Sequence, residues 1–294
     1  MVRWLSRLLK DPPPGWVFEL SEAGIAVART TQPPQMGFRP LEGDVLAVSP
    51  VKDNVQRLEA LTAELRAAAP AAESRKRPGA VVLLPDGSVR VSVLDFDAFP
   101  SDAAQQLSLV RFRIKKSLPF DLEASRLSYY AQAAGGGRVD VVVAVAPLEI
   151  VARYEAAFRA AGFQPGLVTT STLAALHLVR DKAATVLVKL SGRVVTLSLL
   201  AGGVLKLLRS IELGEGTAEE ILGHLYPTFA YAEDQLGARP QRLLVCGFDG
   251  QAGEAASVFG SELGVTAEPL RSRFGAAAGH NAGLLGCLEF LEAA

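Results

Sequence analysis

Residues 185–213, TVLVKLSGRVVTLSLLAGGVLKLLRSIEL, decide the fold. Apolar residues dominate three segments in the way that is typical of buried strands: 185–190, 194–200 and 204–213. Ser191-Gly192 separates the first two segments and Ala201-Gly202-Gly203 the next two, and glycine favours tight hairpin turns. The stretch therefore predicts a three-stranded antiparallel meander.

The sequence after the meander predicts alternating helices and strands. Thr217 with Glu220 three residues later is typical of a helix start, and Gly237 ends a helical pattern that runs to about Leu236. A short apolar strand, a second helix and another short strand follow, the strands at 242–246 and 265–267. The second half of the chain thus has the order strand, strand, strand, helix, strand, helix, strand.

The first half of the chain repeats this order. We expect strands at 16–20, 25–29 and around 44–48, a helix over 54–69, buried strands at 80–84 and 139–145, and a helix between Pro147 and Gly162. This repetition predicts a duplicated α/β fold whose two halves, residues 1–184 and 185–294, face each other across a cleft. Ligands of such folds bind at the carboxyl ends of the strands, facing the cleft.

A small subdomain of strand, helix and strand is expected within the first half, at about 86–137. Its first strand has Val89, Val91 and Val93 on one face, and its second lies near 127–132. Its helix, which follows Pro100-Ser101-Asp102, places one set of side chains on an apolar stripe and another away from it: Leu107, Val110, Ile114 and Leu118 against Arg111, Arg113, Lys115 and Lys116. A solvated basic face explains this pattern better than nucleic-acid binding, because no aromatic platform accompanies it.

Composition excludes several classes of protein. The 294 residues carry 30 Lys+Arg and 31 Asp+Glu, a formal net charge of −1, so no global charge attracts nucleic acid or an anionic membrane. Hydrophobic residues make up 49% and charged residues 21%, which argues against disorder. Two cysteines and three scattered histidines supply neither a disulfide scaffold nor a zinc site. We therefore expect a reduced, cytoplasmic protein without metal ligands of these types.

The segment 1–10, MVRWLSRLLK, has two interpretations. Trp4, Leu5, Leu8 and Leu9 share one helical face with basic residues around it, which suits contact with a membrane surface. A short segment packed on the protein or frayed is the alternative, and we favour it because ten residues make a weak anchor.

Several motifs resemble one known family. The run RFRIKKSLPFD at 111–121, followed by LSYY at 127–130, is similar to the inserted subdomain of the PilM family, the actin-like cytoplasmic component of type IV pilus assembly. VAVAP at 143–147 and STLAAL at 171–176 also resemble that family, so the likeness covers nearly the whole chain from Val81 onward. The cytoplasmic domain of GspL from type II secretion is the nearest alternative.

The resemblance implies an actin-like fold of two RNase H-like halves, with the small subdomain inserted in the first. It also implies a scaffold at the inner face of the cytoplasmic membrane that binds the short N-terminal cytoplasmic peptide of a single-span protein, PilN, between the inserted subdomain and the first half. The candidate partner-binding residues are apolar side chains with a basic rim: Phe112, Leu118 and Phe120 with Arg113 and Lys116.

The family likeness implies an ATP site in the cleft, and the two hairpins that would build it have changed here. In place of the first Asp-x-Gly motif the chain has Glu19 and Leu20, followed by Ser21, so a carboxylate remains but the glycine that lets backbone approach phosphate is lost. In place of the second acid the chain has Lys189, ahead of Ser191 and Gly192. A lysine can pair with phosphate but cannot hold Mg²⁺.

The third element of an actin-like site, a glycine-rich loop beside the adenosine, is altered as well. Gly247 and Asp249 remain, but bulky Phe248 replaces a second glycine. We therefore expect a vestigial nucleotide cleft formed by Glu19, Ser21, Ser191, Gly192, Gly247 and Asp249, with no catalytic residues and no assigned cofactor. Binding of ATP with Mg²⁺ stays open.

An active actin-like ATPase or small-molecule kinase is the rival function. It needs a carboxylate at or near position 189, and the sequence offers none there. The phosphate-binding motif of P-loop enzymes is absent, and Cys246 on a buried strand is expected to be inert. The sequence therefore favours recognition over catalysis.

Overall fold

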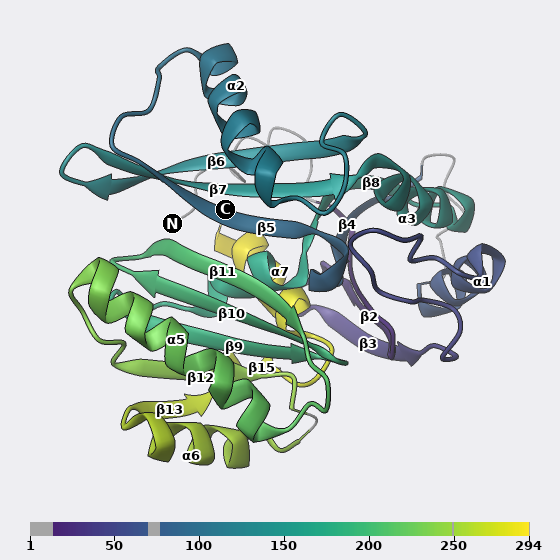
Figure 1. The fold of residues 1–294 in the computed structure, drawn as a ribbon. Helices are drawn as coiled ribbons and strands as arrows, with labels where there is room; N and C mark the ends of the chain where they lie inside the picture. Colours follow the sequence, from purple (N-terminus) through teal and green to yellow (C-terminus); the bar gives the residue numbers. More distant parts are fainter. Residues whose placement is uncertain (1–13, 70–76, 249, 294) are drawn as a thin grey trace.

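The structure contains two five-stranded sheets with the same strand order (Figure 1). It is a computed structural model that describes residues 14–69, 77–248 and 250–293. The first sheet has the order β3-β2-β1-β4-β8, with β1 (Trp16–Ser21), β2 (Gly24–Arg29), β3 (Gln35–Pro40), β4 (Gly79–Leu84) and β8 (Gln164–Thr170). The second has the order β11-β10-β9-β12-β13, with β9 (Thr185–Ser191), β10 (Val194–Ala201), β11 (Val204–Glu212), β12 (Arg242–Cys246) and β13 (Thr266–Pro269). In each sheet the first three strands form an antiparallel meander and the other two run parallel to its first strand. The predicted duplicated α/β fold is confirmed.

Helices cover the outer face of each sheet and bury its apolar residues. The first sheet packs on α1 (Leu58–Ala68) and α3 (Leu148–Ala161), and the second on α5 (Ala218–Leu236) and α6 (Ala252–Leu263). Helix α5 begins and ends where the sequence predicts: the Thr217 side chain accepts a hydrogen bond from the Glu220 amide, and Gly237 ends the helix with a φ of 63°.

The last helix, α7 (Ala282–Ala293), lies between the two sheets (Figure 1). Leu284 packs in the core cluster under the first sheet, and Leu285 packs in a cluster with strands of the second sheet. The helix sits directly on α4 (Ser171–Ala175), because Gly286 has no side chain: a Cβ there would lie 2.1 Å from the Ala174 carbonyl oxygen. The chain thus returns from its second half to the first, and the strands β14 (Arg271–Ser272) and β15 (Gly275–Ala276) precede this return.

The insert is a three-stranded antiparallel sheet of order β5-β7-β6 with one helix. Its elements are β5 (Arg90–Phe96), α2 (Ala103–Ile114), β6 (Ser125–Gly135) and β7 (Arg138–Pro147). Val110 and Ile114 of α2 are fully buried against one face of this sheet. The other face packs on the second half, where Val91 meets Leu200 and Leu208.

One strand prediction was wrong, and a second was right about the strand but not about the sheet that it belongs to. Around 44–48 the structure has only an isolated bridge between Leu46 and Val55, and the third strand is the earlier β3, a mostly exposed edge strand. Its alternating Met36 and Phe38 stand between Pro33-Pro34 and Pro40, and prolines in a sequence are typical of a loop. Residues 139–145 lie in the middle strand of the insert, and the fifth strand of the first sheet is β8. Since α2 covers one face of β7 and the second half covers the other, the strand resembles one from a buried parallel sheet.

The insert sheet extends to Pro147, so a boundary at 137 divides it between β6 and β7. The division at 184 and 185 falls between the two five-stranded sheets and remains a proposal. The expectations for Trp4, Leu5, Leu8 and Leu9, and for Asp249, lie outside the described residues. Among the residues that are described, no helix is both long enough and apolar enough to cross a membrane.

Candidate functional site: the cleft between the halves

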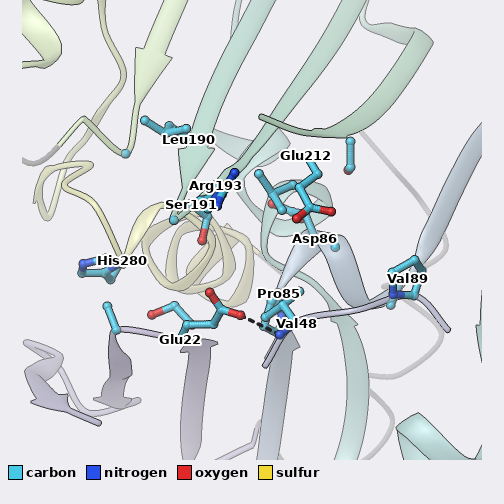
Figure 2. A pocket seen from close by; sticks show the side chains of 18 of the residues that line it. Glu22, Val48, Pro85, Asp86, Val89, Leu190, Ser191, Arg193, Glu212 and His280 are labelled. Atoms are coloured by element: carbon cyan, nitrogen blue, oxygen red, sulfur yellow. Dashed lines mark hydrogen bonds between the residues drawn. The ribbon is translucent and has the colours of Figure 1, made fainter. Parts of the chain in front are cut away.

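A cavity of about 490 Å³ lies between the two halves, where the first turn of each meander faces the other (Figure 2). Ser21 and Glu22 line it from the β1–β2 turn, and Ser191 and Gly192 from the β9–β10 turn. Gly247 lines it at the end of β12. The structure thus brings together at one cavity Ser21, Ser191, Gly192 and Gly247 of the predicted cleft residues, but Glu19 is not part of its lining.

Three charged side chains form a buried cluster at the cavity, and one of them, Asp86, is part of its lining. The Lys189 ammonium is 2.9 Å from Oδ2 of Asp86, and the two residues are only 3% and 4% exposed. Asp86 also accepts hydrogen bonds from the backbone amide and the hydroxyl of Thr172, at 2.8 and 2.6 Å. Because Asp86 follows β4 of the first half and Lys189 is on β9 of the second, this ion pair joins the halves.

Glu19 of β1 is the third charged member of the cluster. It accepts hydrogen bonds from the Ser171 hydroxyl and from the Leu284 amide near the start of α7, the latter at 2.7 Å. Its carboxylate is therefore engaged within the protein. A negative charge is also favourable at the N-terminal end of a helix, where amide groups have no partner within the helix.

Burial and charge compete in setting the pKa values of this cluster. Burial raises the pKa of Glu19, and the opposing influence of Lys189 and of the hydrogen bonds only partly offsets this effect. For Lys189, burial lowers the pKa, but the charges of Asp86 and Glu19 outweigh burial and raise it. Lys189 is accordingly a cation at neutral pH. Burial also raises the pKa of the Cys246 thiol to about 12, as an inert cysteine requires.

Glu22 places a carboxylate between the two turns. Its Oε1 accepts a hydrogen bond from the Val48 amide at 2.6 Å, and its Oε2 is 3.6 Å from the point where a Cβ on Gly192 would lie. Figure 2 shows this side chain directed toward Ser191. The Glu22 carboxylate thus lies between the two turns, in a cavity whose lining also carries Arg90 and Arg193.

The side chains that replace the expected glycines pack in the apolar cores of the two halves. Leu20 is fully buried in the core of the first half, and the Phe248 ring packs edge-on against Phe259 of α6, with 5.9 Å between ring centroids. Gly247, which has a φ of 88°, allows β12 to end directly against β9: a Cβ there would lie 1.8 Å from the Leu190 carbonyl oxygen. Close packing of backbone explains this glycine without any ligand.

Sequence reasoning missed Asp86 and Glu22. Asp86 directly follows Pro85 at the carboxyl end of a predicted buried strand, which is where functional acids of such sheets gather. That position was a usable signal for Asp86. Glu22 lies in an ordinary polar turn, and nothing in its sequence context distinguishes it.

The candidate partner-binding residues divide into two groups on the insert. Leu118 and Phe120 are half-buried against the insert's own core. Phe112 is 69% exposed, and Lys116 is exposed as well. The Arg113 guanidinium lies over the Phe96 ring, 5.1 Å from its centroid. Phe112, Arg113 and Lys116, which are all exposed, are therefore the members of this set that a partner can reach directly.

Comparison with solved structures identifies the class of fold. A Bacteroides thetaiotaomicron protein with an actin-like ATPase fold matches with a TM-score of 0.58 and 11% identity, over 96% of this chain and 98% of that chain. The chain therefore has an actin-like fold. No family model matches it, and no curated protein matches it by sequence.

A chain from a PilM–PilN type IV pilus biogenesis complex matches more fully. Its TM-score is 0.78 at 19% identity, over 96% of this chain and 99% of that chain. The uncovered 4% is far shorter than the insert at 86–147, so the insert takes part in the match. In its fold, this protein is PilM-like.

Proposed function

We propose that this protein is a PilM-like cytoplasmic scaffold at the inner face of the cytoplasmic membrane, serving type IV pilus assembly. Its partner is the N-terminal cytoplasmic peptide of a PilN-like single-span membrane protein. The observation that carries this proposal is the match, insert included, to a chain solved in a PilM–PilN complex.

The insert offers a surface with the chemistry that a short peptide needs. Phe112 is a large exposed apolar side chain, and such aromatic anchors dominate binding energy in many interfaces. Lys116 beside it adds a positive charge, and no salt bridge to Lys116 occurs among the described residues. Leu118 and Phe120 fix the surface by packing into the core of the insert. We propose that the peptide lies along this edge and contacts Phe112, Arg113 and Lys116.

We expect Phe112→Ala to weaken peptide binding at least tenfold, since the variant loses an exposed apolar anchor. Lys116→Glu is expected to weaken binding of a peptide that carries an acidic group, and more so at low ionic strength. Calorimetric titration with the synthetic N-terminal peptide of the PilN-like protein from the same genome measures both effects.

Two exposed residues outside the insert provide matched controls for these variants. Tyr226→Ala removes an aromatic ring that is 48% exposed, and Lys182→Glu repeats the charge reversal at an exposed lysine that is not part of the insert. Both controls should bind like the unaltered chain, and all four variants should keep its melting temperature. Equal binding by Phe112→Ala and Tyr226→Ala would refute the assignment of this surface.

We also propose that the cleft does not use MgATP. The carboxylate of Glu19 is engaged by Ser171 and Leu284, and position 189 is a cation that is already paired with Asp86. Among the described residues, no group of three or more His, Cys, Asp and Glu side chains is placed to hold a metal ion. The protein accordingly acts by binding and performs no catalysis.

Calorimetry with MgATP, run beside ATP with EDTA, tests this second proposal separately from peptide binding. No heat of binding is expected in either titration. Micromolar binding that requires Mg²⁺ would overturn the proposal and favour the rival ATPase or kinase.

A further inference from the structure

The two halves of this protein are joined by buried polar contacts at more than one place. The first is the Lys189–Asp86 ion pair, which crosses from β9 to the segment after β4. Opening the cleft at this point would separate a cation from its only close carboxylate partner among the described residues. Breaking a buried pair is strongly unfavourable because it leaves uncompensated charge.

A second set of contacts joins the insert to the edge strand of the second half. The Lys206 ammonium of β11 is 2.6 Å from Oδ2 of Asp140 on β7, and both side chains are largely buried. The Gln132 side chain of β6 pairs with the backbone of Leu205, donating to its carbonyl and accepting from its amide, each at 3.1 Å. The insert is thus held against β11 by an ion pair and by two hydrogen bonds to the backbone of Leu205.

The third contact is α7, which belongs to the second half in sequence but packs under both sheets. Leu284 contributes to the first cluster and Leu285 to the second, and the Leu284 amide donates to Glu19 of β1. The helix therefore fills the space between the halves. Rotation of one half against the other would have to expose its apolar surface to water.

We propose that these contacts hold the halves in one closed arrangement without a ligand, and that the Lys189 ammonium is the internal cation that makes this possible. It neutralises carboxylates from the first half at the base of the cleft, while Glu22 supplies the anion between the two turns. The protein therefore presents its insert in a fixed position that no nucleotide modulates. This closed arrangement of the cleft does not depend on which partner the insert binds.

The test measures the distance between the halves in the full chain. Glu59 of α1 and Glu254 of α6 are exposed and lie on opposite halves, so Glu59→Cys and Glu254→Cys provide sites for spin labels. Cys246 and Cys287 are buried and remain in place. Pulsed electron resonance then gives the distance distribution with and without millimolar MgATP.

A single narrow distribution, unchanged by MgATP, is expected for the labelled parent chain. Lys189→Met should broaden the distribution and shift it to longer distances, whereas Lys182→Met, which removes an exposed lysine just before β9, should leave it unchanged. Asp86→Asn serves as the second disrupting variant if Lys189→Met does not fold. A parent distribution that moves with MgATP would overturn the proposal, as would an unchanged distribution in the disrupting variants.

Discussion

Lys189→Met is expected to lower the free energy of unfolding by about 3–5 kcal/mol, the range observed when one partner of a buried ion pair is removed. Methionine matches the length and apolar stem of lysine, so little of the loss should come from packing. What remains is an uncompensated Asp86 carboxylate, only 4% exposed, with Glu19 nearby. Urea denaturation monitored by circular dichroism measures the change.

A double-mutant cycle isolates the ion pair from other effects. Asp86→Asn keeps the shape of the side chain, and Lys189→Met/Asp86→Asn should be more stable than the sum of the two single losses predicts. The pKa of Glu19 is already raised, and losing Lys189 raises it further, because the cation favours the charged carboxylate. A carboxyl group whose pKa is raised in the folded state destabilises the fold as pH rises. The difference in the free energy of unfolding between Lys189→Met and the unaltered chain should therefore become smaller as pH falls. A loss below about 1 kcal/mol would show that the pair is not needed for stability.

Gly247→Ala is expected to lower the free energy of unfolding by about 2–5 kcal/mol. The left-handed backbone costs an alanine about 1–2 kcal/mol, and overpacking adds about 1–3 kcal/mol. The added Cβ would lie 1.8 Å from the Leu190 carbonyl oxygen, a backbone atom that cannot move aside alone. The loss should be the same with and without MgATP, since packing rather than phosphate explains this glycine.

Gly250→Ala separates the cost of the left-handed backbone from the cost of overpacking. Gly250 has the same φ of 88° as Gly247, but a Cβ added there would meet nothing within 4 Å. Its loss should therefore include only the backbone cost. Equal losses for the two variants, measured by the same denaturation, would refute the close packing of β12 against β9.

Much of the fold is predictable from the sequence because its signals are local. The β9–β10–β11 meander follows from apolar runs with glycine turns, and Thr217 and Gly237 mark both ends of α5. The two differences have separate causes. Prolines on both sides of Met36 and Phe38 make the exposed edge strand β3 resemble a loop in the sequence, and β7 resembles a strand of the main sheet because the other half of the protein covers its second face.

The site is harder to predict because its chemistry depends on partners far apart in sequence. Lys189 stands out as a cation at an expected acid position, but its partner Asp86 is 103 residues away. Glu19 is recognisable in the sequence as the remaining carboxylate of a vestigial site, whereas its Ser171 and Leu284 partners depend on how α7 returns to the first half. Sequence patterns indicate which charged residues are unusual, and only the fold shows which ion-pair and hydrogen-bond partners stabilise them.

The central claim is that this protein recognises a PilN-like peptide without using nucleotide. The most direct measurement is a calorimetric titration of the unaltered chain with that peptide, first in EDTA and then in millimolar MgATP. We predict saturable binding with the same Kd in both buffers. Binding that appears only with MgATP, or no binding in either buffer, would contradict the account.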